Sequence, residues 1–336
     1  MNPEYYRDSS ANQAISDTFS TIEHIKKVDP ANQLISPIIT PRFAPSCTSS
    51  LLSSLGQLAK EQDLQIQTHI SESPSEIALV ASLFPAQNSY AAVYDAHNLL
   101  TPRTVLAHGV HLSADERNLI KARKSKISHC PVSNTSISSG ICPVRELLDS
   151  GIEVGLGTDV SGGYSSSILV AAREAGMVSR IIASLYDPTS SGQEPQKETL
   201  PIGNVETAEK ASANAKNEGD VSVADRKKLS VEETLYLATR GGANCLNLGH
   251  KIGAFEVGMQ WDAQLFRLHE IDGSVSDADE GDVGDLGGEG DGGDRGVPEL
   301  WGKETWEEKV AKWVIGGDDR NTKMVFVAGR LVHRRS

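Results

Sequence analysis

The first half of the chain repeats one pattern, in which a short apolar segment ends in a polar residue and a helix follows. The five apolar segments span residues 34–40, 64–69, 104–108, 126–129 and 152–156. Strands that alternate with helices are typical of parallel sheets with crossover helices. None of these segments carries the GxGxxG sequence or the phosphate-loop lysine of a nucleotide-binding sheet. Because the polar residues gather at the carboxyl ends of the strands, where (β/α) barrels have their active sites, we expect an α/β protein of the (β/α)-barrel type.

Apolar residues at helical spacing predict helices over 12–28, 74–84, 144–148, 166–183 and 231–248. A strand over 262–266 and a hairpin over 323–332 follow, and we expect them to lie outside the barrel. These predictions divide the chain into a barrel domain, residues 1–250, and a C-terminal part, residues 251–336. The C-terminal part would supply the strands of a partial β-sandwich, with a closing helix and hairpin.

Two segments of biased composition interrupt the pattern. Residues 187–228 are rich in Ser, Glu, Lys and Asn and are predicted to be a disordered insertion. Residues 271–297 are rich in Gly and Asp and are predicted to be a solvated loop. One imperfect copy of a calcium-binding repeat within that loop is too little to indicate a calcium site.

The acidic charge of the chain is concentrated in the second of these segments. Nine acidic residues and no Lys or Arg lie between Asp272 and Asp294, and the formal net charge of the whole chain is −13. The remaining sequence is only mildly acidic. Nucleic acids and anionic membranes bind to basic surfaces, so we expect neither as a partner.

Cysteine usage and hydropathy predict the compartment. The four cysteines, Cys47, Cys130, Cys142 and Cys245, form no CxxC pair. No apolar run approaches the roughly 20 residues of a membrane span, and residues 1–10 carry no apolar signal segment. We therefore expect a reduced, cytoplasmic protein.

The polar residues at the predicted strand ends suggest one shared site. They are His69 with Glu72, His108, His129 and Asp159. A histidine can hold a metal ion while a carboxylate three residues later moves a proton of the metal's water. Each residue has a plainer interpretation: His108 as a loop hydrogen-bond partner, His129 as a lining residue and Asp159 as a helix cap. One site explains the set better than separate coincidences, and its nitrogen and oxygen donors suit a catalytic zinc or iron ion.

Four segments at these strand ends carry a family resemblance: THISE at 68–72, LAHG at 106–109, SHCP at 128–131 and GLGTD at 155–159. Together they resemble the metal-dependent amidohydrolase superfamily. Three further segments make the chain similar to the guanine deaminase family within it: TPRF at 40–43, DVSGGY at 159–164 and GGDDRN at 316–321. The resemblance covers residues 3–180 and 229–332 and implies an amidohydrolase-type (β/α)8 barrel.

The resemblance also implies a reaction and its residues. A water activated by one Zn²⁺ ion per subunit, or by iron, would attack C2 of guanine and release xanthine and ammonia. The implied metal ligands are His69 and Asp159, with His108 as a third ligand or as the group that orients the water, and Glu72 is the implied proton shuttle. Arg42 would donate to O6 or N7 of guanine, and Phe43 would pack on the purine ring. We thus expect Glu72, His108 and Asp159 to be catalytic, and Arg42, Phe43 and His69 to complete the substrate-binding set.

The chain departs from the family at one point. The first barrel strand of the family carries a His-x-His pair with two further metal ligands, and this sequence contains no His-x-His. We therefore expect a barrel that is incomplete at its N-terminus, whereas the full-length family form is implied to be a homodimer. Two alternatives stay open: a catalytically impaired fragment or non-catalytic relic that lacks those ligands, and a related amidohydrolase that acts on another aminated heterocycle.

Overall fold

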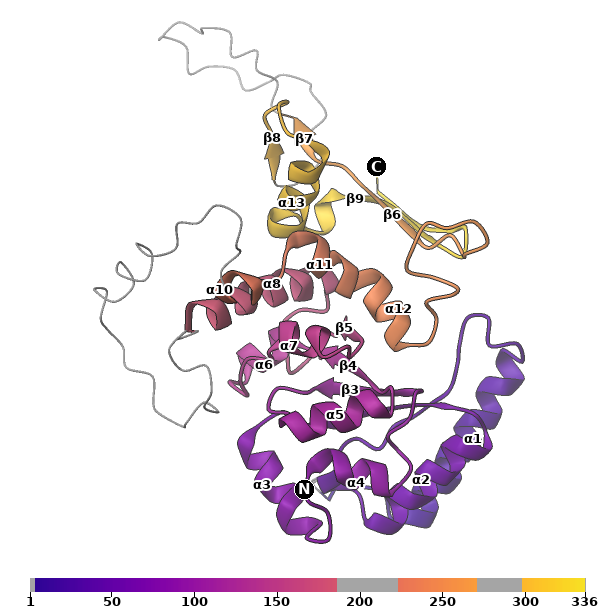
Figure 1. Ribbon diagram of the computed structural model, residues 1–336. Helices are drawn as coiled ribbons and strands as arrows, with labels where there is room; N and C mark the ends of the chain where they lie inside the picture. Colours follow the sequence, from indigo (N-terminus) through magenta and orange to yellow (C-terminus); the bar gives the residue numbers. More distant parts are fainter. Residues whose placement is uncertain (1–3, 186–222, 271–297, 336) are drawn as a thin grey trace, which may run out of the picture.

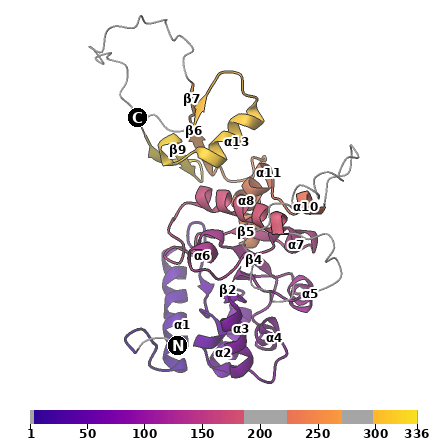
Figure 2. The same ribbon diagram turned by 90° about the vertical axis from the view of Figure 1, so that its left-hand side faces the viewer.

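The computed structural model of the protein describes residues 4–185, 223–270 and 298–335. An α/β part, formed by the N-terminal half of the chain, carries a smaller antiparallel sheet from the C-terminal residues (Figure 1). The views in Figures 1 and 2 agree that this second sheet lies beyond helix α8 (Ile168–Leu185) and outside the parallel sheet. The predicted position of the C-terminal strands outside the barrel is thus confirmed.

The central element is a parallel sheet of five strands whose spatial order follows the sequence. Its strands are β1 (Ile38–Ile39), β2 (Gln65–Ile70), β3 (Thr104–His108), β4 (Lys126–His129) and β5 (Val154–Leu156). All four neighbouring pairs are parallel. The sheet is open among the described residues, as expected for a partial (β/α) barrel. Because the strands are parallel, all their carboxyl ends lie at one edge.

The first strand is much shorter than predicted. Only Ile38 and Ile39 pair with β2, whereas Leu34 is 75% exposed. The backbone N–H groups of Leu34 and Ile35 donate to Oδ2 of Asp29, at 2.6 and 3.0 Å. These groups are therefore used in a loop that follows the first helix, and the prediction of a buried strand over 34–40 is wrong for its first half.

Helices connect the strands and cover the sheet. They are α1 (Ala11–Val28), α2 (Ser49–Glu61), α3 (Pro74–Leu83), α4 (Tyr90–Ala96), α5 (Ala114–Ala122), α6 (Pro131–Ser136) and α7 (Val144–Asp149), followed by α8. Helices α3 and α5 begin with capping boxes, in which a serine and a glutamate three residues later satisfy each other's backbone N–H groups. Helix α6 was not predicted, because its six residues, PVSNTS, have no apolar period.

The predicted helix over 231–248 is helical with a local change of winding. It consists of α11 (Val231–Tyr236), a π-helical turn η3 (Leu237–Gly241) and α12 (Gly242–Cys245). A Cβ at Gly155 of β5 would come within 2.8 Å of the Gly242 Cα, so a glycine is required for this close approach. These turns cover β5, the last strand of the sheet.

The biased segments lie mostly outside the described residues, namely 186–222 and 271–297. The end of the first segment is folded: α10 (Val223–Arg226) precedes Lys227, whose Nζ donates to Oε1 of Glu146 at 3.1 Å. The prediction of disorder is therefore wrong for residues 223–228. This basic side chain is fixed against the acidic side chain on α7.

The C-terminal residues form an antiparallel sheet of β6 (Ala263–Phe266), β9 (Thr322–Val327) and β10 (Arg330–Arg334), and the last two are the predicted hairpin. Two short strands, β7 (His269–Glu270) and β8 (Glu299–Leu300), pair beside it, and α13 (Trp306–Gly316) is the predicted closing helix. The Phe266 ring stacks on Trp313 with ring centroids 4.1 Å apart. Arg173 of α8 donates to the carbonyl oxygens of Val314 and Gly317, which fixes the end of α13 to the α/β part.

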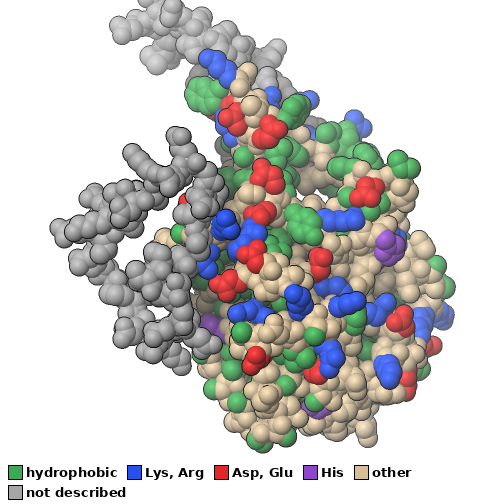
Figure 3. All heavy atoms as spheres, viewed as in Figure 1, with side chains coloured by type: hydrophobic (Ala, Val, Ile, Leu, Met, Phe, Trp, Pro, Cys, Tyr) green, Lys and Arg blue, Asp and Glu red, His purple; other side chains and the backbone are tan. Residues whose placement is uncertain are grey.

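The surface carries charges of both signs. On the face seen in Figure 3, Lys and Arg side chains lie among Asp and Glu side chains. Within the described ranges, no helix has both the length and the apolar character that a membrane crossing requires. Cytoplasmic location stays a prediction.

Candidate active site

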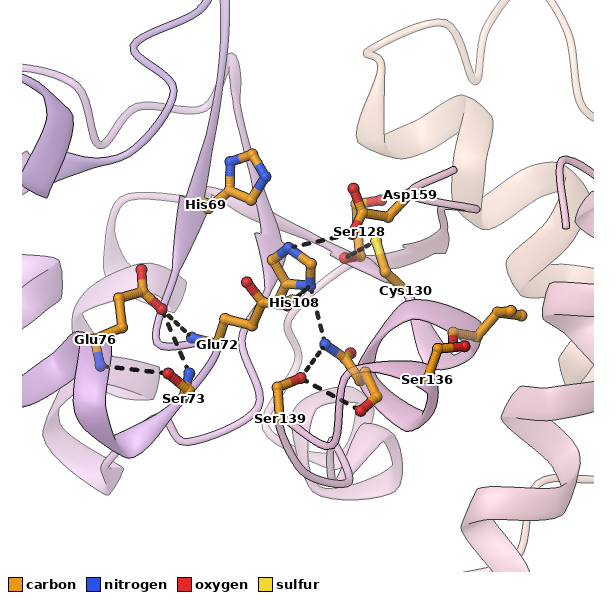
Figure 4. A network of polar contacts seen from close by, with 12 residues as sticks. His69, Glu72, Ser73, Glu76, His108, Ser128, Cys130, Ser136, Ser139 and Asp159 are labelled. Atoms are coloured by element: carbon orange, nitrogen blue, oxygen red, sulfur yellow. Dashed lines mark hydrogen bonds and ion pairs between the residues drawn. The ribbon is translucent and has the colours of Figure 1, made fainter. Parts of the chain in front are cut away.

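Three side chains from separate strand ends converge at the carboxyl edge of the parallel sheet. His69 lies on β2, His108 ends β3, and Asp159 lies three residues beyond β5. One potential ligand atom from each residue lies within 4.8 Å of the others. Figure 4 shows these three side chains facing one another, with Glu72 beside His108. His69 and Ala107 are register partners on adjacent parallel strands, so the end of β3 that carries His108 lies beside the end of β2 that carries His69.

The ring of His69 is oriented by a backbone group. Its Nδ1 lies 2.6 Å from the carbonyl oxygen of Arg42, which also accepts the backbone N–H of His69 at 3.2 Å. A carbonyl oxygen can only accept, so Nδ1 carries the proton and Nε2 keeps its lone pair. Hydrogen bonds of this kind fix the ring orientation of metal-binding histidines.

Glu72 occupies an environment that favours its protonated form. Burial, with the nearby carboxylates of Glu76 and Asp159, raises the pKa of Glu72 to about 7. Its Oε1 lies 3.5 Å from Nδ1 of His108. A carboxyl group with a pKa near 7 can both accept and deliver a proton at neutral pH, which is the property required of a general acid and base.

His108 is fully buried. Burial, followed by the neighbouring His69, lowers the pKa of His108 to about 4, so the ring is neutral at pH 7. Its Nδ1 lies 3.1 Å from the amide nitrogen of Asn134. Its Nε2 lies 4.0 Å from Oδ2 of Asp159 and has no hydrogen-bond partner among the described residues.

The backbone at two of these positions is strained. His108 has a φ of +73° and Asp159 a φ of +44°. Such left-handed conformations are uncommon for residues other than glycine and cluster at functional sites. A Cβ at Gly162 would come within 2.7 Å of the Asp159 carboxylate, so the glycine lets the following turn approach this side chain.

The donor set fits a divalent cation. Two imidazoles and one carboxylate meet without a thiolate, which suits a catalytic zinc or iron ion rather than a structural zinc. The lone pair on Nε2 of His69 and the buried, unpaired Nε2 of His108 supply polar atoms that a cation or its water could engage.

Phe43 lies beside His69, and Arg42 lies next to Phe43. The guanidinium of Arg42 lies over the Phe43 ring, 5.5 Å from its centroid, and is exposed. The Phe43 ring meets the His69 ring edge-on, with centroids 6.3 Å apart. The predicted substrate-binding pair therefore adjoins the predicted metal ligands.

His129 does not join the group of converging ligand atoms. It is 1% exposed, and neither ring nitrogen has a hydrogen-bond partner among the described residues. Burial, followed by the neighbouring His108, lowers the pKa of His129 to about 3. It lines the interior behind the site, which matches the plainer of its two interpretations.

Three polar residues around the site were not predicted. Asn134 contacts His108, Ser139 contacts Asn134, and the Tyr94 hydroxyl lies 2.7 Å from the carbonyl oxygen of His69. The only sequence signal was the position of Asn134 and Ser139 shortly after a strand end that carries a histidine. Tyr94 had no signal, because its partners are distant in sequence.

Comparisons with known proteins agree with this geometry. The Amidohydrolase family profile matches residues 9–332. The chain is 42% identical over 332 residues to the "probable guanine deaminase" of Schizosaccharomyces pombe, with 99% of this chain and 52% of that protein covered. It superposes with a TM-score of 0.71 and 30% identity on the guanine deaminase of C. acetobutylicum, whose structure holds guanine in the active site. That superposition covers 99% of this chain and 62% of the other.

A more distant structure shares only the fold. An adenosine deaminase from Xanthomonas campestris with bound zinc has a TM-score of 0.66 and 19% identity, over 96% of this chain and 56% of the other. The chain spans about half the length of the curated relatives it matches.

Proposed function

Because this chain belongs to the amidohydrolase family, we propose that it provides the active site of a guanine deaminase, which hydrolyses guanine to xanthine and ammonia. The observation that carries the proposal is the convergence of His69, His108 and Asp159 beside Glu72. The similarity to proteins named guanine deaminase supports the substrate.

His69 and Asp159 would hold the metal ion, through the free Nε2 of the imidazole and the carboxylate. Zinc is the proposed metal and iron the alternative. When bound, such an ion would lower the pKa of a water molecule to about 7, so that a hydroxide is available at neutral pH. His108 is placed in the same group as a third ligand or as the residue that orients the attacking oxygen.

Glu72 would move the protons of the reaction. It would take one proton from the attacking water and pass it to the ring nitrogen next to C2, and then move the remaining proton of that oxygen to the departing amine. A C2–O bond forms, the bond from C2 to the exocyclic nitrogen breaks, and ammonia leaves. The raised pKa of Glu72 suits both halves of this transfer.

Arg42 and Phe43 would bind the purine. The guanidinium offers donors to O6 or N7 of guanine, and the aromatic ring offers a face for stacking. Their position beside His69 would bring C2 of the bound base toward the carboxylate of Glu72.

Xanthine formation from guanine by the zinc-loaded chain tests the proposal. The expected result is turnover that disappears in Glu72→Gln. No turnover by a chain that binds zinc would overturn the guanine assignment, whereas a chain that binds no zinc would favour the impaired-fragment alternative. If the chain hydrolyses another aminated heterocycle and Arg42→Ala leaves that activity intact, the related-amidohydrolase alternative holds.

We also propose that the full-length family form is a cytoplasmic homodimer that binds neither nucleic acid nor membranes. Sedimentation equilibrium tests the dimer, with twice the mass of one chain as the expected result.

A further inference from the structure

A buried amide contacts Nδ1 of His108, the ring nitrogen that also lies 3.5 Å from Oε1 of Glu72. Asn134 lies on α6 and is 2% exposed. Its amide nitrogen lies 3.1 Å from Nδ1 of His108 and 2.9 Å from the hydroxyl oxygen of Ser139. Its Oδ1 is buried without a hydrogen-bond partner among the described residues. Figure 4 shows His108 and Ser139 within this network of polar contacts.

The two orientations of this amide are not equivalent. With the nitrogen toward His108 and Ser139, each amide hydrogen has an acceptor, and one carbonyl oxygen stays unpaired. With the amide reversed, both hydrogens would point to the place where Oδ1 lies now, which has no hydrogen-bond partner among the described residues. Buried donors without acceptors are rarer and more costly than an under-used carbonyl oxygen, so the first orientation is favoured.

Ser139 supports the same orientation. The hydroxyl of Ser139 donates to the backbone carbonyl oxygen of Asn134, at 3.5 Å. A hydroxyl has a single hydrogen. The oxygen of Ser139 accepts from the Asn134 amide at 2.9 Å while its one hydrogen is used by that carbonyl, so it could not also donate to a reversed amide. The contacts of Ser139 thus favour the first orientation of the amide.

This network determines which nitrogen of His108 carries the proton. The ring is buried and hence neutral, with one N–H group. Since Nδ1 accepts from Asn134, the hydrogen is on Nε2, which faces the group of converging ligand atoms. A protonated nitrogen has no lone pair for a cation, but it can donate to an oxygen atom.

We propose that Asn134 is a positioning residue that keeps His108 in its Nε2–H tautomer. His108 then acts as a hydrogen-bond donor toward an oxygen atom at the centre of the site and is not a metal ligand. Of the three converging residues, His69 and Asp159 alone keep lone pairs for the cation. The role of His108 in catalysis rests on the proposed function. The tautomer of His108 does not, because it is a property of the metal-free chain.

Nitrogen-15 NMR of the metal-free, histidine-labelled chain tests the tautomer directly. Protonated and unprotonated ring nitrogens give separate signals, and the signals of His108 are those absent from His108→Gln. The expected result is a protonated Nε2 and an unprotonated Nδ1. A protonated Nδ1 overturns the inference, whether or not the chain converts guanine.

Two variants of matched size test the cause. Asn134→Asp places a carboxylate, which only accepts, against Nδ1, so His108 should switch to the Nδ1–H tautomer. Ser139→Ala leaves the Asn134 amide in place and should keep the Nε2–H tautomer. An unchanged tautomer in folded Asn134→Asp overturns the inference, and circular dichroism identifies the folded variants. If Asn134→Asp does not fold, Asn134→Leu replaces it. If His108 is still found only as the Nε2–H tautomer in Asn134→Leu, the inference is overturned.

Zinc affinity gives a second readout. In Asn134→Asp, the freed lone pair on Nε2 of His108 can serve as a third zinc ligand. The affinity for zinc should therefore rise by roughly 10- to 100-fold. Xanthine formation should fall in the same variant, because the donor to the attacking oxygen is lost. An Nε2–H tautomer in a chain that never forms xanthine leaves the inference standing and overturns only the proposed function.

Discussion

The carbonyl oxygen of Arg42 lies 2.6 Å from Nδ1 of His69, so the loop that carries the guanidinium also orients a candidate metal ligand. The backbone of this residue acts on the imidazole, while its exposed side chain lies over Phe43. One residue thus contributes to metal binding and to substrate binding through different atoms. The two contributions can be separated by mutation.

Arg42→Ala should weaken guanine binding and leave zinc binding unchanged. The variant keeps the carbonyl that orients His69 and loses only the donors to the purine. A hydrogen bond from a charged group contributes about 1.5–3 kcal/mol, which corresponds to a rise in KM of roughly 10- to 150-fold. Steady-state kinetics and zinc titration measure the two effects. Arg103→Ala, near the opposite end of β3, is the control, and loss of zinc binding in Arg42→Ala would contradict the separation.

Glu72→Gln should abolish proton transfer in an otherwise intact site. General acid–base catalysis contributes about 10²- to 10⁴-fold to rate, and kcat should fall by that factor. The amide has nearly the shape of the carboxyl group, so the melting temperature and zinc content should stay close to those of the unaltered chain. Glu23→Gln, at an exposed position on α1, is the matched control. A Glu72→Gln enzyme with more than a tenth of the original kcat would exclude Glu72 as the proton shuttle.

Tyr94→Phe should destabilise the fold and loosen the site. The fully buried hydroxyl accepts the backbone N–H of Ala44 at 3.1 Å, contacts the Thr68 hydroxyl at 2.9 Å and donates to the carbonyl of His69 at 2.7 Å. Its removal takes away the acceptor of the Ala44 N–H and a donor to the His69 carbonyl, at a cost of about 1–3 kcal/mol. Urea denaturation of the variant measures the loss. Tyr164→Phe, at an exposed tyrosine, should change the free energy of unfolding by less than ~0.5 kcal/mol, and an equal loss in both variants would contradict this role.

His129 should make the metal-free chain less stable in acid. Burial lowers the pKa of His129 from its ordinary 6.5 to about 3, so the folded state binds fewer protons than the unfolded state between these values. Its contribution to stability is complete above pH 6.5 and is lost as pH falls toward 3, with a slope of at most about 1.4 kcal/mol per pH unit.

His129→Gln removes this titration. Denaturation between pH 7 and 4 should therefore show a smaller loss of stability in the variant than in the unaltered chain. His24→Gln, at an exposed position on α1, should keep the original slope. Equal slopes for His129→Gln and the unaltered chain would mean that His129 is protonated in the folded state.

Local patterns predicted most of the parallel sheet. The β3 segment, 104–108, was predicted with its observed bounds, and parallel pairing was enough to bring His69, His108 and Asp159 to one edge. The shortening of β1 was not predictable, because Asp29 takes the preceding N–H groups through a contact that periodicity does not report. Helix α6 escaped prediction because its polar sequence has no apolar face.

The polar surroundings of the site depend on contacts between distant parts of the chain. Asn134 reaches His108 across 26 positions, and Tyr94 reaches Ala44 across 50. Such contacts depend on the packing of helices against the sheet, which residue spacing does not specify. The sequence therefore predicted the ligand candidates and missed the side chains that orient them.

Zinc titration of the metal-free chain tests the central claim, that His69 and Asp159 belong to one cation site. Competition with a chromophoric chelator should give one zinc ion per chain, and His69→Asn or Asp159→Asn should each weaken that binding at least tenfold. His97→Asn, at a buried histidine that ends α4 and whose ring bonds Ser49 and Val93, should leave it unchanged. A chain that binds no zinc, or one whose affinity is the same in both site variants, would contradict the account.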